Sequence, residues 1–259
     1  MKKFKFKKKY GQNFLNDNNV LEKIVNNLEV TNKDLIIEIG PGTGNLTKKL
    51  LKFNSKILAY EIDIDTKEYL NNIKYSELTV LYSDFLKRNI KRDIKNIKYE
   101  NLYIIGNLPY YITTPIIDKI IQEDLKAKEL IFMVQKEVAD RLSATPGKKE
   151  YSYITVKLKY YYNIIKLFDV SKKSFYPIPK VDSSILKLTP HNQYLFEKEE
   201  KFLKVISSSF KYKRKTLLNN LKDYDREIVK KILKKYNYTE FVRAEELPIE
   251  IFLEISNAL

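Results

Sequence analysis

A glycine-rich turn between a predicted strand and a predicted helix constrains the fold of this chain most strongly. The apolar run Leu35–Ile39 predicts a buried strand, Gly-Pro-Gly-Thr-Gly follows at 40–44, and 45–51 has the pattern of a helix. Glycines in such a turn let the backbone approach a ligand closely, and the helix start offers unpaired amide donors. The spacing is GxGxG rather than GxGxxG, which disfavours pyrophosphate binding. No Gly-Lys-Ser/Thr follows, which excludes a nucleoside triphosphate loop.

Three further predicted strands alternate with helices, and each is followed by polar residues. These strands are expected at 56–60, 78–82 and 102–106. Such alternation predicts an α/β fold with a parallel, doubly wound sheet, whose ligand lies outside the carboxyl ends of the strands. The residues that follow the three strands are, in chain order, Glu61-Ile62-Asp63, Ser83-Asp84-Phe85 and Asn107-Leu108-Pro109-Tyr110.

The strand ends suit a nucleoside. An acid about twenty residues after the glycine turn, here Glu61, is placed to accept both ribose hydroxyls. The carboxylate of Asp84 suits the amino group of an adenine, with Phe85 as an apolar flank. One acid at a strand end is more often simply solvated, but three consecutive strands with such endings form a less accidental pattern.

The segment 107–110 brings an amide, a main-chain carbonyl and a flat ring together. That set can hold a planar base by its exocyclic amine. Taken alone it is weak, because Asn and Pro are ordinary turn residues after a strand. Thr113 is expected to open the next helix.

The second half of the chain changes texture. A fifth strand is expected at 130–134 and a helix at 137–142. The next predicted strands, which finish the sheet in antiparallel fashion, are 154–162, 164–170 and 184–188. A loop at 175–180 is stiffened by two prolines. Helices are expected at 196–222, 226–236 and 248–258, so we place a catalytic domain at 1–190 and a helical domain at 191–259.

The two basic segments of the chain have different expected roles. Residues 1–17 form a basic arm whose last part contains apolar and amide side chains. This change of composition indicates that the arm folds back onto the protein. Asp17 or Asn18 is expected to cap the helix that follows. The segment 210–215 interleaves aromatic and basic residues, as in a nucleic-acid-facing helix. A helix with a solvated basic face is an equal alternative.

Composition narrows the function classes. The chain has 259 residues and no Cys, which excludes disulfides, thiolate metal sites and a Cys nucleophile and suits a reducing cytosol. Its single His, His191, argues against His-based zinc sites and triads. The net charge of +15 indicates either a polyanionic partner or compositional drift. No apolar run approaches the ~20 residues of a membrane span, and the Lys-rich opening lacks the apolar core of a signal peptide.

These residues together resemble the KsgA-type ribosomal RNA adenine dimethyltransferases, from about Tyr10 to the C-terminus. The resemblance implies a Rossmann-like class I methyltransferase sheet, mostly parallel with an antiparallel finish, followed by a small helical domain. The motifs that carry it are Tyr10-Gly-Gln-Asn-Phe-Leu15, Glu38-Ile-Gly-Pro-Gly-Thr-Gly44, Asn107-Leu-Pro-Tyr110, Gln135-Lys-Glu-Val-Ala139, Phe175-Tyr-Pro-Ile-Pro-Lys-Val-Asp-Ser183, Arg214-Lys-Thr-Leu-Leu-Asn-Asn-Leu221 and Arg243-Ala-Glu-Glu-Leu247.

The resemblance implies S-adenosylmethionine as methyl donor and two adjacent adenosines near the 3′ end of small-subunit rRNA as acceptors. The expected cofactor-binding residues are Asn13, Leu15, Gly40, Gly42, Glu61, Ile62, Asp84, Phe85 and Asn107. The expected catalytic residues are Asn107, Leu108, Pro109 and Tyr110, and no metal is expected. The expected RNA-binding residues are Tyr110, Phe175, Lys211, Lys213, Arg214 and Lys215.

Several alternatives remain open at this stage. Phe175 either stacks on the target base or packs in the core, and Tyr111 is a second candidate for the stacking role of Tyr110. Large-subunit rRNA methyltransferases of the macrolide-resistance type share the layout, although they usually carry Ile where this chain has Leu108. Non-catalytic RNA-binding assembly or transcription factors use the same fold. We expect a cytoplasmic monomer that acts on immature small subunits.

Overall fold

The computed structural model describes residues 12–109, 112–191, 193 and 199–259, and the chain divides into two compact units. Unit 1 comprises the chain to Ala139 together with Ile165–Thr189, and unit 2 comprises Asp140–Ile164 and Pro190–Leu259. The predicted boundary near 190 therefore needs a correction, because 140–164 belongs with the C-terminal helices. The physical reason is burial: side chains of this segment, such as Val156 and Tyr160, lie in the hydrophobic core of unit 2.

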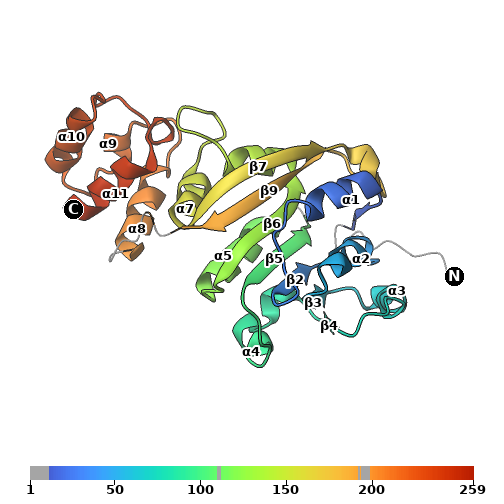
Figure 1. The fold of residues 1–259 in the computed structure, drawn as a ribbon. Helices are drawn as coiled ribbons and strands as arrows, with labels where there is room; N and C mark the ends of the chain where they lie inside the picture. The colour runs from blue at the N-terminus through green and yellow to red at the C-terminus, as the bar shows by residue number, and fades with distance from the viewer. Residues whose placement is uncertain (1–11, 110–111, 192, 194–198) are drawn as a thin grey trace. The chain divides into compact units, whose positions relative to one another are not determined.

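Among the described residues, seven strands form the main sheet of unit 1, in the order β4-β3-β2-β5-β6-β9-β7 (Figure 1). The pairs within β4-β3-β2-β5-β6 are parallel, and β6 pairs with β9 antiparallel, as the sequence predicts. The strand bounds are β2 (Leu35–Ile39), β3 (Lys56–Glu61), β4 (Leu78–Tyr82), β5 (Leu102–Asn107), β6 (Ala127–Gln135), β7 (Tyr162–Val170) and β9 (Ser183–Pro190).

Helices cover both faces of this sheet. Figure 1 shows α1, α2 and α3 on one side of it and α4 and α5 on the other. All five residues of β2 are accordingly buried, as expected for a parallel strand covered on both faces. The helices of unit 1 are α1 (Asn18–Val25), α2 (Asn45–Leu50), α3 (Lys67–Asn71), α4 (Ile90–Ile94) and α5 (Thr113–Gln122), and α6 (Lys136–Leu142) crosses into unit 2. Short 3-10 helices are η2 (Leu51–Phe53), η3 (Ile64–Thr66), η4 (Phe85–Lys87) and η5 (Lys172–Ser174).

The strand order reverses between β2 and β5, and this reversal locates the site. From β2 the chain runs to β3 and β4 on one side, and it then returns to place β5 on the other. Ile39 is in register with Tyr60 on one neighbour and Gly106 on the other, so the three strands end at the same edge. A crevice at such a switch point is where open α/β sheets bind their ligands.

The described part of the basic arm folds back, as the sequence predicts. Residues β1 (Phe14–Leu15) pair antiparallel with β8 (Phe175–Tyr176), and the amide of Asn16 donates to the carbonyl of Ser174 at 2.9 Å. Asp17 caps α1, since its side chain accepts from the amides of Asn19 and Val20. The arm thereby crosses the edge where the strands end.

Unit 2 is helical, and two of its predicted elements are wrong. Residues 154–162 were expected as a strand but form α7 (Tyr153–Tyr161), which begins at a capping box of Ser152 and Thr155. The helix expected at 196–222 is interrupted, because 210–216 forms turns in which the segment 211–215 is exposed. The other helices of unit 2 are α8 (Glu199–Ser209), α9 (Leu217–Asn220), α10 (Arg226–Lys235), η6 (Ala244–Glu246) and α11 (Ile249–Ala258).

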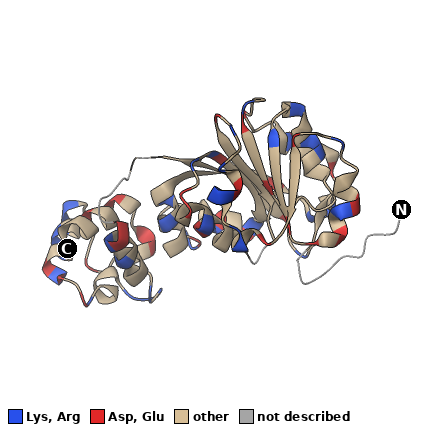
Figure 2. Ribbon diagram, turned by 90° about the horizontal axis from the view of Figure 1, so that it is seen from below, with Lys and Arg blue, Asp and Glu red and all other residues tan. Residues whose placement is uncertain are grey.

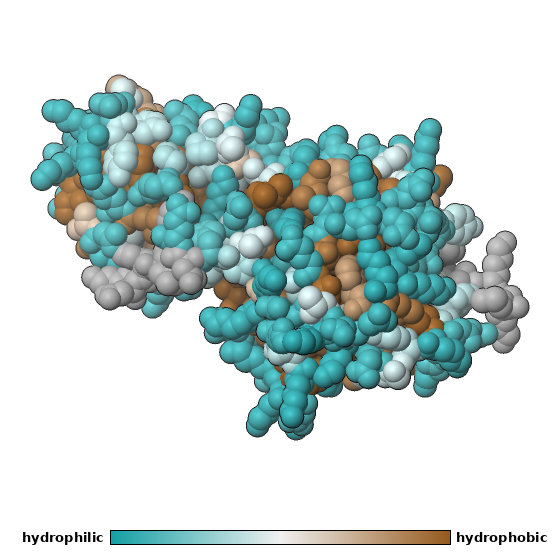
Figure 3. Space-filling model, in the orientation of Figure 1, coloured by the Kyte–Doolittle hydropathy of each residue, from teal (hydrophilic) through white to brown (hydrophobic). Residues whose placement is uncertain are grey.

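The surface of both units is polar and charged. Figure 2 shows Lys and Arg on each unit, so the basic charge is not confined to one of them. Figure 3 shows that hydrophilic residues cover most of the visible face of each unit, with smaller apolar patches among these residues. None of the helices in the described part of the chain combines the length and apolar character that crossing a bilayer requires.

Candidate active site

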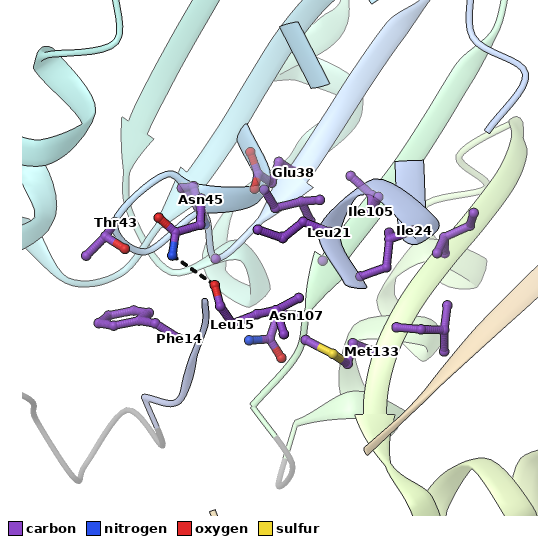
Figure 4. Close-up of a pocket in the computed structure, with 16 residues that line it drawn as sticks. Phe14, Leu15, Leu21, Ile24, Glu38, Thr43, Asn45, Ile105, Asn107 and Met133 are labelled. Atoms are coloured by element: carbon purple, nitrogen blue, oxygen red, sulfur yellow. Dashed lines mark hydrogen bonds between the residues drawn. The ribbon is translucent and has the colours of Figure 1, made fainter. Parts of the chain in front are cut away.

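Two hollows of the described chain open where β2, β3 and β5 end, and they share Phe14, Gly40 and Asn107. We call them the inner and outer hollows. The inner hollow is largely apolar and is lined by residues that include Leu15, Leu21, Glu38, Asn45, Ile131 and Met133 (Figure 4). The outer hollow is lined by residues that include Gln12, Asn13, Gly42, Glu61, Ile62 and Leu108. Residues from the arm, the glycine loop and the end of β5 thus meet at one place.

The glycine loop is tied to the end of β3. The amide of Gly40 donates to the carbonyl of Tyr60 at 2.9 Å, and the amide of Gly42 donates to Oε2 of Glu61 at 2.8 Å. Gly42 has φ +57°, and a Cβ there would lie 2.5 Å from the ring of Phe14. Only glycine therefore permits both this left-handed backbone and the packing of the arm on the loop.

Glu61 is buried and held by backbone amides. Besides Gly42, the amide of Asp63 donates to its Oε1 at 2.7 Å. Burial raises the pKa of Glu61, whereas these amide hydrogen bonds oppose the rise. Each carboxylate oxygen retains a further lone pair, so Glu61 can accept hydroxyl groups of a ligand in the outer hollow.

Glu38 is a functional candidate that the sequence prediction did not assign. It is the fourth of the five residues of the buried strand β2, it lines the inner hollow, and it is 1% exposed. Its Oε2 makes no hydrogen bond within the described residues. Burial raises the pKa of Glu38 to about 8; the nearby hydroxyl of Thr47 opposes this rise, and the charge of Glu61 adds to it. A buried acceptor without a partner is costly unless a ligand satisfies it. Its position as first residue of the motif at 38–44 was the available signal.

Asn107 is fixed by the arm. Its side-chain Nδ2 donates to the main-chain carbonyl of Asn13 at 2.9 Å. The amide of Leu108 donates to the carbonyl of Met133 at 3.1 Å, which anchors the chain beyond β5 to β6. Just before it, a Cβ at Gly106 would lie 2.6 Å from the carbonyl oxygen of Ile39, so β5 approaches β2 too closely for a side chain. The amide of Asn107 therefore has a defined orientation at the boundary of both hollows.

Two amide side chains that the sequence prediction passed over hold the arm in place. Gln12 donates through Nε2 to Oδ2 of Asp63 at 2.6 Å, which links the arm to the loop after Glu61. Asn45 donates to the carbonyl of Leu15 at 2.8 Å (Figure 4). Because both contacts span long sequence separations, they become visible only in the folded chain.

Other predicted residues fall in different places. Ile62 lines the outer hollow and is 46% exposed. Asp84 accepts a hydrogen bond from the amide of Leu86 at 2.9 Å, and Phe85 is buried with its ring 5.3 Å from that of Tyr60. Asp84 and Phe85 are not among the described residues that line the two hollows, so their contact with a nucleoside stays a prediction.

The predicted substrate-binding aromatics have different outcomes. Phe175 is 3% exposed and belongs to the core cluster of unit 1, which favours the core alternative and corrects its expected stacking role. The reason is its pairing with Leu15 across β1 and β8, which turns the ring inward. Tyr110 and Tyr111 lie outside the described residues. The four predicted basic residues of unit 2, Lys211, Lys213, Arg214 and Lys215, are exposed on turns rather than on a helix.

The outer hollow fits a nucleoside-containing cofactor. Glu61 offers acceptors for ribose hydroxyls, the exposed Gly40 presents its backbone there, and Ile62 presents an apolar surface for a base. The inner hollow adds Glu38, whose Oε2 has no hydrogen-bond partner among the described residues and can accept from a donor group, and a cation bound there would favour the ionised form of this side chain. S-adenosylmethionine, which combines a ribose, a base and an ammonium group, matches this donor and acceptor set.

Comparison with known proteins gives consistent matches. A family model described as ribosomal RNA adenine dimethylase matches residues 3–259. The chain is 41% identical over 255 residues to ribosomal RNA small subunit methyltransferase A of Aster yellows witches'-broom phytoplasma, covering 96% of this chain and 94% of the relative. It is 39% identical over 268 residues to the protein of the same name from Bacillus pumilus, covering 99% and 92%.

Solved structures agree with these matches. A dimethyladenosine transferase from Plasmodium falciparum superposes with a TM-score of 0.77 at 28% identity, covering 93% of this chain and 95% of the other. The 23S rRNA methyltransferase ErmE also gives a TM-score of 0.77, at 24% identity and with 95% and 99% covered. The second likeness speaks for the fold alone.

Proposed function

The chain belongs to the ribosomal RNA adenine dimethylase family, and from this premise we propose that it transfers methyl groups from S-adenosylmethionine to the N6 amino groups of two adjacent adenosines near the 3′ end of small-subunit rRNA. The observation that carries the proposal is the held amide of Asn107. It stands at the boundary of both hollows, with its nitrogen engaged by Asn13, beside the backbone of Gly40, and it lines the same outer hollow as Glu61.

The amide of Asn107 suits adenine because of the chemistry of the amino group. The lone pair of that group is delocalised into the ring, which makes the nitrogen a poor nucleophile. Because Nδ2 of Asn107 donates to Asn13, its Oδ1 is the branch that we assign to accept one amino hydrogen. The main-chain carbonyl of Leu108 accepts the other. Two acceptors on the amino hydrogens favour a pyramidal nitrogen with its lone pair directed at the methyl group.

When bound, S-adenosylmethionine supplies a sulfonium methyl that is already a strong electrophile. The residues of this chain then contribute binding and alignment rather than covalent chemistry, as in other proximity-driven reactions. Glu61 holds the ribose hydroxyls, and Glu38 offers a buried acceptor to the far end of the cofactor. Pro109 shapes the turn, and Tyr110 is the residue whose ring we propose to stack on the target base, a contact of ~1–3 kcal/mol.

The second methylation changes the demand on the same acceptors. After the first transfer only one amino hydrogen remains, so one carbonyl contact must be given up and a methyl group admitted in its place. The target adenosine must also leave its stack to reach Asn107, which favours unpaired RNA over a duplex.

The setting of the reaction follows from the same reasoning. We propose that the exposed cations of 211–215 contact RNA phosphates. We further propose that the protein works as a cytoplasmic monomer on immature small subunits and takes part in their assembly. The predicted catalytic region 1–190 and helical region 191–259 would divide these tasks, with 140–164 now assigned to the helical unit.

The proposal is tested by primer extension across the 3′ end of small-subunit rRNA, in cells with and without this protein. Dimethylated adenosines block the Watson–Crick edge, so two adjacent stops are expected only when the protein is present. Purified protein should also transfer methyl groups to small-subunit particles or RNA, but not to RNA in which both adenosines are replaced. Stops that do not depend on the protein would refute the proposal.

Two alternatives make different predictions in the same assays. A large-subunit rRNA methyltransferase of the macrolide-resistance type would methylate large-subunit RNA instead. A non-catalytic assembly factor would bind small-subunit particles equally well after replacement of Glu61 or Asn107, and calorimetry would detect no binding of S-adenosylmethionine.

A further inference from the structure

Unit 2 contains a hollow of its own, which we call the C-terminal hollow. It encloses about 180 Å³, more than twice the about 70 Å³ of the outer hollow beside Glu61. Its walls come from four segments of the chain: the start of α7, the turns after α8, the end of α9 and the residues of η6. Its lining residues include Tyr151, Tyr153, Phe210, Tyr212, Lys213 and Asn220.

Four of the ten residues that line the hollow are aromatic. Tyr151 is buried with its ring 6.2 Å from that of Phe210, while Tyr153 is only partly buried. Tyr212 is 49% exposed, so part of its ring is accessible to a ligand from solvent. Flat rings in a hollow open to solvent provide faces on which a planar, apolar ligand can stack.

The backbone of Tyr212 is clamped from within. Asn220 is mostly buried, and its Oδ1 accepts from the amide of Tyr212 while its Nδ2 donates to the carbonyl of Tyr212, both at 3.1 Å. This pair of hydrogen bonds imitates a strand ladder and fixes the turn that carries the exposed ring. Thr216 then caps α9, so the turn is rigid on both sides.

Cations surround the ring. The Nζ atoms of Lys215 and Lys211 lie 4.4 and 5.5 Å from the centroid of Tyr212, and the segment 211–215 is exposed throughout. Lys213 lines the hollow itself. Positive charge beside aromatic faces is the combination that binds single-stranded nucleic acid, with phosphates on the cations and bases on the rings.

We propose that the C-terminal hollow is a second RNA subsite, which takes one unpaired nucleobase of the RNA substrate with Tyr212 stacked at its rim and the phosphates on Lys211, Arg214 and Lys215. The proposal rests on the proposed RNA substrate and deepens it, because it adds base stacking to the phosphate contacts of the same turn. Glu245, which also lines the hollow, offers a carboxylate acceptor for an exocyclic amino group.

The interaction energies favour replacement of a lysine by a nucleobase on the ring of Tyr212. An exposed cation–π contact contributes about 0.5–1 kcal/mol, whereas stacking of a base on an aromatic side chain contributes about 1–3 kcal/mol. When RNA arrives, Lys215 can leave the ring for a phosphate and the base can occupy the face. The ring is therefore expected to add base-dependent affinity, while the lysines add salt-dependent affinity.

The test compares two RNAs of equal charge. One is a short unpaired oligonucleotide, and the other is an oligonucleotide of the same length whose residues are abasic. Full-length protein is titrated with each by fluorescence anisotropy at several salt concentrations. We expect wild type to prefer the base-bearing RNA, and Tyr212→Ala to reduce that preference by about 5- to 150-fold with the salt slope unchanged. Tyr212→Phe should keep the preference, because the ring remains.

Matched variants keep the result interpretable. Tyr236→Ala removes another exposed ring of unit 2, one that is 37% exposed, and should leave the preference intact. Tyr212→Leu preserves apolar packing without a flat face, so it should lose the preference while its thermal unfolding stays that of wild type. If Tyr212→Ala and Tyr212→Leu weaken both RNAs equally, or leave the preference unchanged, the subsite is refuted. If the wild-type protein does not methylate small-subunit RNA, the proposed function is refuted instead, and the preference for the base-bearing oligonucleotide can still be measured.

Discussion

Replacement of Gly42 by Ala tests the packing of the arm on the glycine loop. The added Cβ would lie 2.5 Å from Cε1 and 2.8 Å from Cδ1 of Phe14, and the three nearest atoms to it all belong to that ring. Real Cβ atoms do not approach so closely, so the ring or the loop must move. Either movement disturbs a wall that the two hollows share, since Phe14 lines both.

The expected loss has two parts. A left-handed backbone at an Ala residue costs roughly 1–2 kcal/mol of stability. Movement of the loop also weakens the hydrogen bond from the amide of Gly42 to Glu61, and a hydrogen bond to a charged group contributes about 1.5–3 kcal/mol. If the ribose site depends on that bond, the affinity for S-adenosylmethionine falls by about 10- to 150-fold.

Gly147→Ala is the matched control, because Gly147 also has a positive φ, +82°, but a Cβ there meets nothing within 4 Å. Isothermal titration calorimetry should show a large loss of cofactor affinity in Gly42→Ala and wild-type affinity in Gly147→Ala, although both lose stability. The double variant Phe14→Ala/Gly42→Ala should lose less cofactor affinity than the sum of the losses in the two single variants, because the clash between the new Cβ and the ring is gone. Wild-type cofactor affinity in Gly42→Ala would refute the described contact between arm and loop.

Three further predictions use other parts of the chain. Glu38→Gln should flatten the pH dependence of the free energy of unfolding. Because the pKa of Glu38 is raised, this side chain stabilises the fold fully below about pH 4.5 and loses that contribution as the pH rises to about 8, a change of at most about 5 kcal/mol. If the free energy of unfolding, measured with urea, depends on pH equally in both proteins, this prediction is wrong. Asp17→Ala and Asp225→Ala each remove a helix N-cap and should each cost about 1 kcal/mol by urea unfolding, but only Asp17→Ala should weaken cofactor binding, because only that cap holds the arm. Arg214→Ala and Lys215→Ala should each lower the salt slope of RNA binding by about 1, measured by anisotropy, and unchanged slopes would exclude phosphate contacts.

The parallel sheet was predictable because its strands carry local signals. Leu35–Ile39 and 78–82 are apolar runs bounded by turns, and both appear as strands with the predicted bounds. The parallel order and the gathering of strand ends at one edge then follow from the alternation with helices. Glu61 and Asn107 could be placed at the site for the same reason, since each directly ends a strand.

The misassigned elements were decided by tertiary contacts. Residues 154–162 are rich in β-branched and aromatic side chains, which favour strands locally. They form α7 because Val156 and Tyr160, four residues apart, both enter the core of unit 2. The break after α8 likewise depends on Asn220, whose side chain replaces the helical partners of Tyr212.

Individual site residues were hidden for similar reasons. The sequence left two roles open for Phe175, because the partner that decides between them, Leu15, is far away in the sequence and their pairing involves only two residues on each strand. Glu38 looks like an isolated polar residue in an apolar strand, and its unsatisfied oxygen becomes apparent only when the inner hollow forms above it. Sequence periodicity can place a residue on an element, but it does not show which atoms lack a partner.

The central claim is that the amide of Asn107 orients the target amine, and single-turnover methyl transfer to small-subunit RNA by Asn107→Ala tests it most directly. By analogy with removal of one preorganised hydrogen-bonding group from an enzyme site, the rate should fall by about 100- to 1,000-fold. Cofactor affinity should stay within about tenfold of wild type, and the unfolding transition should be kept. A variant that folds, binds S-adenosylmethionine and methylates RNA at the wild-type rate would contradict the claim and leave 107–110 as a turn.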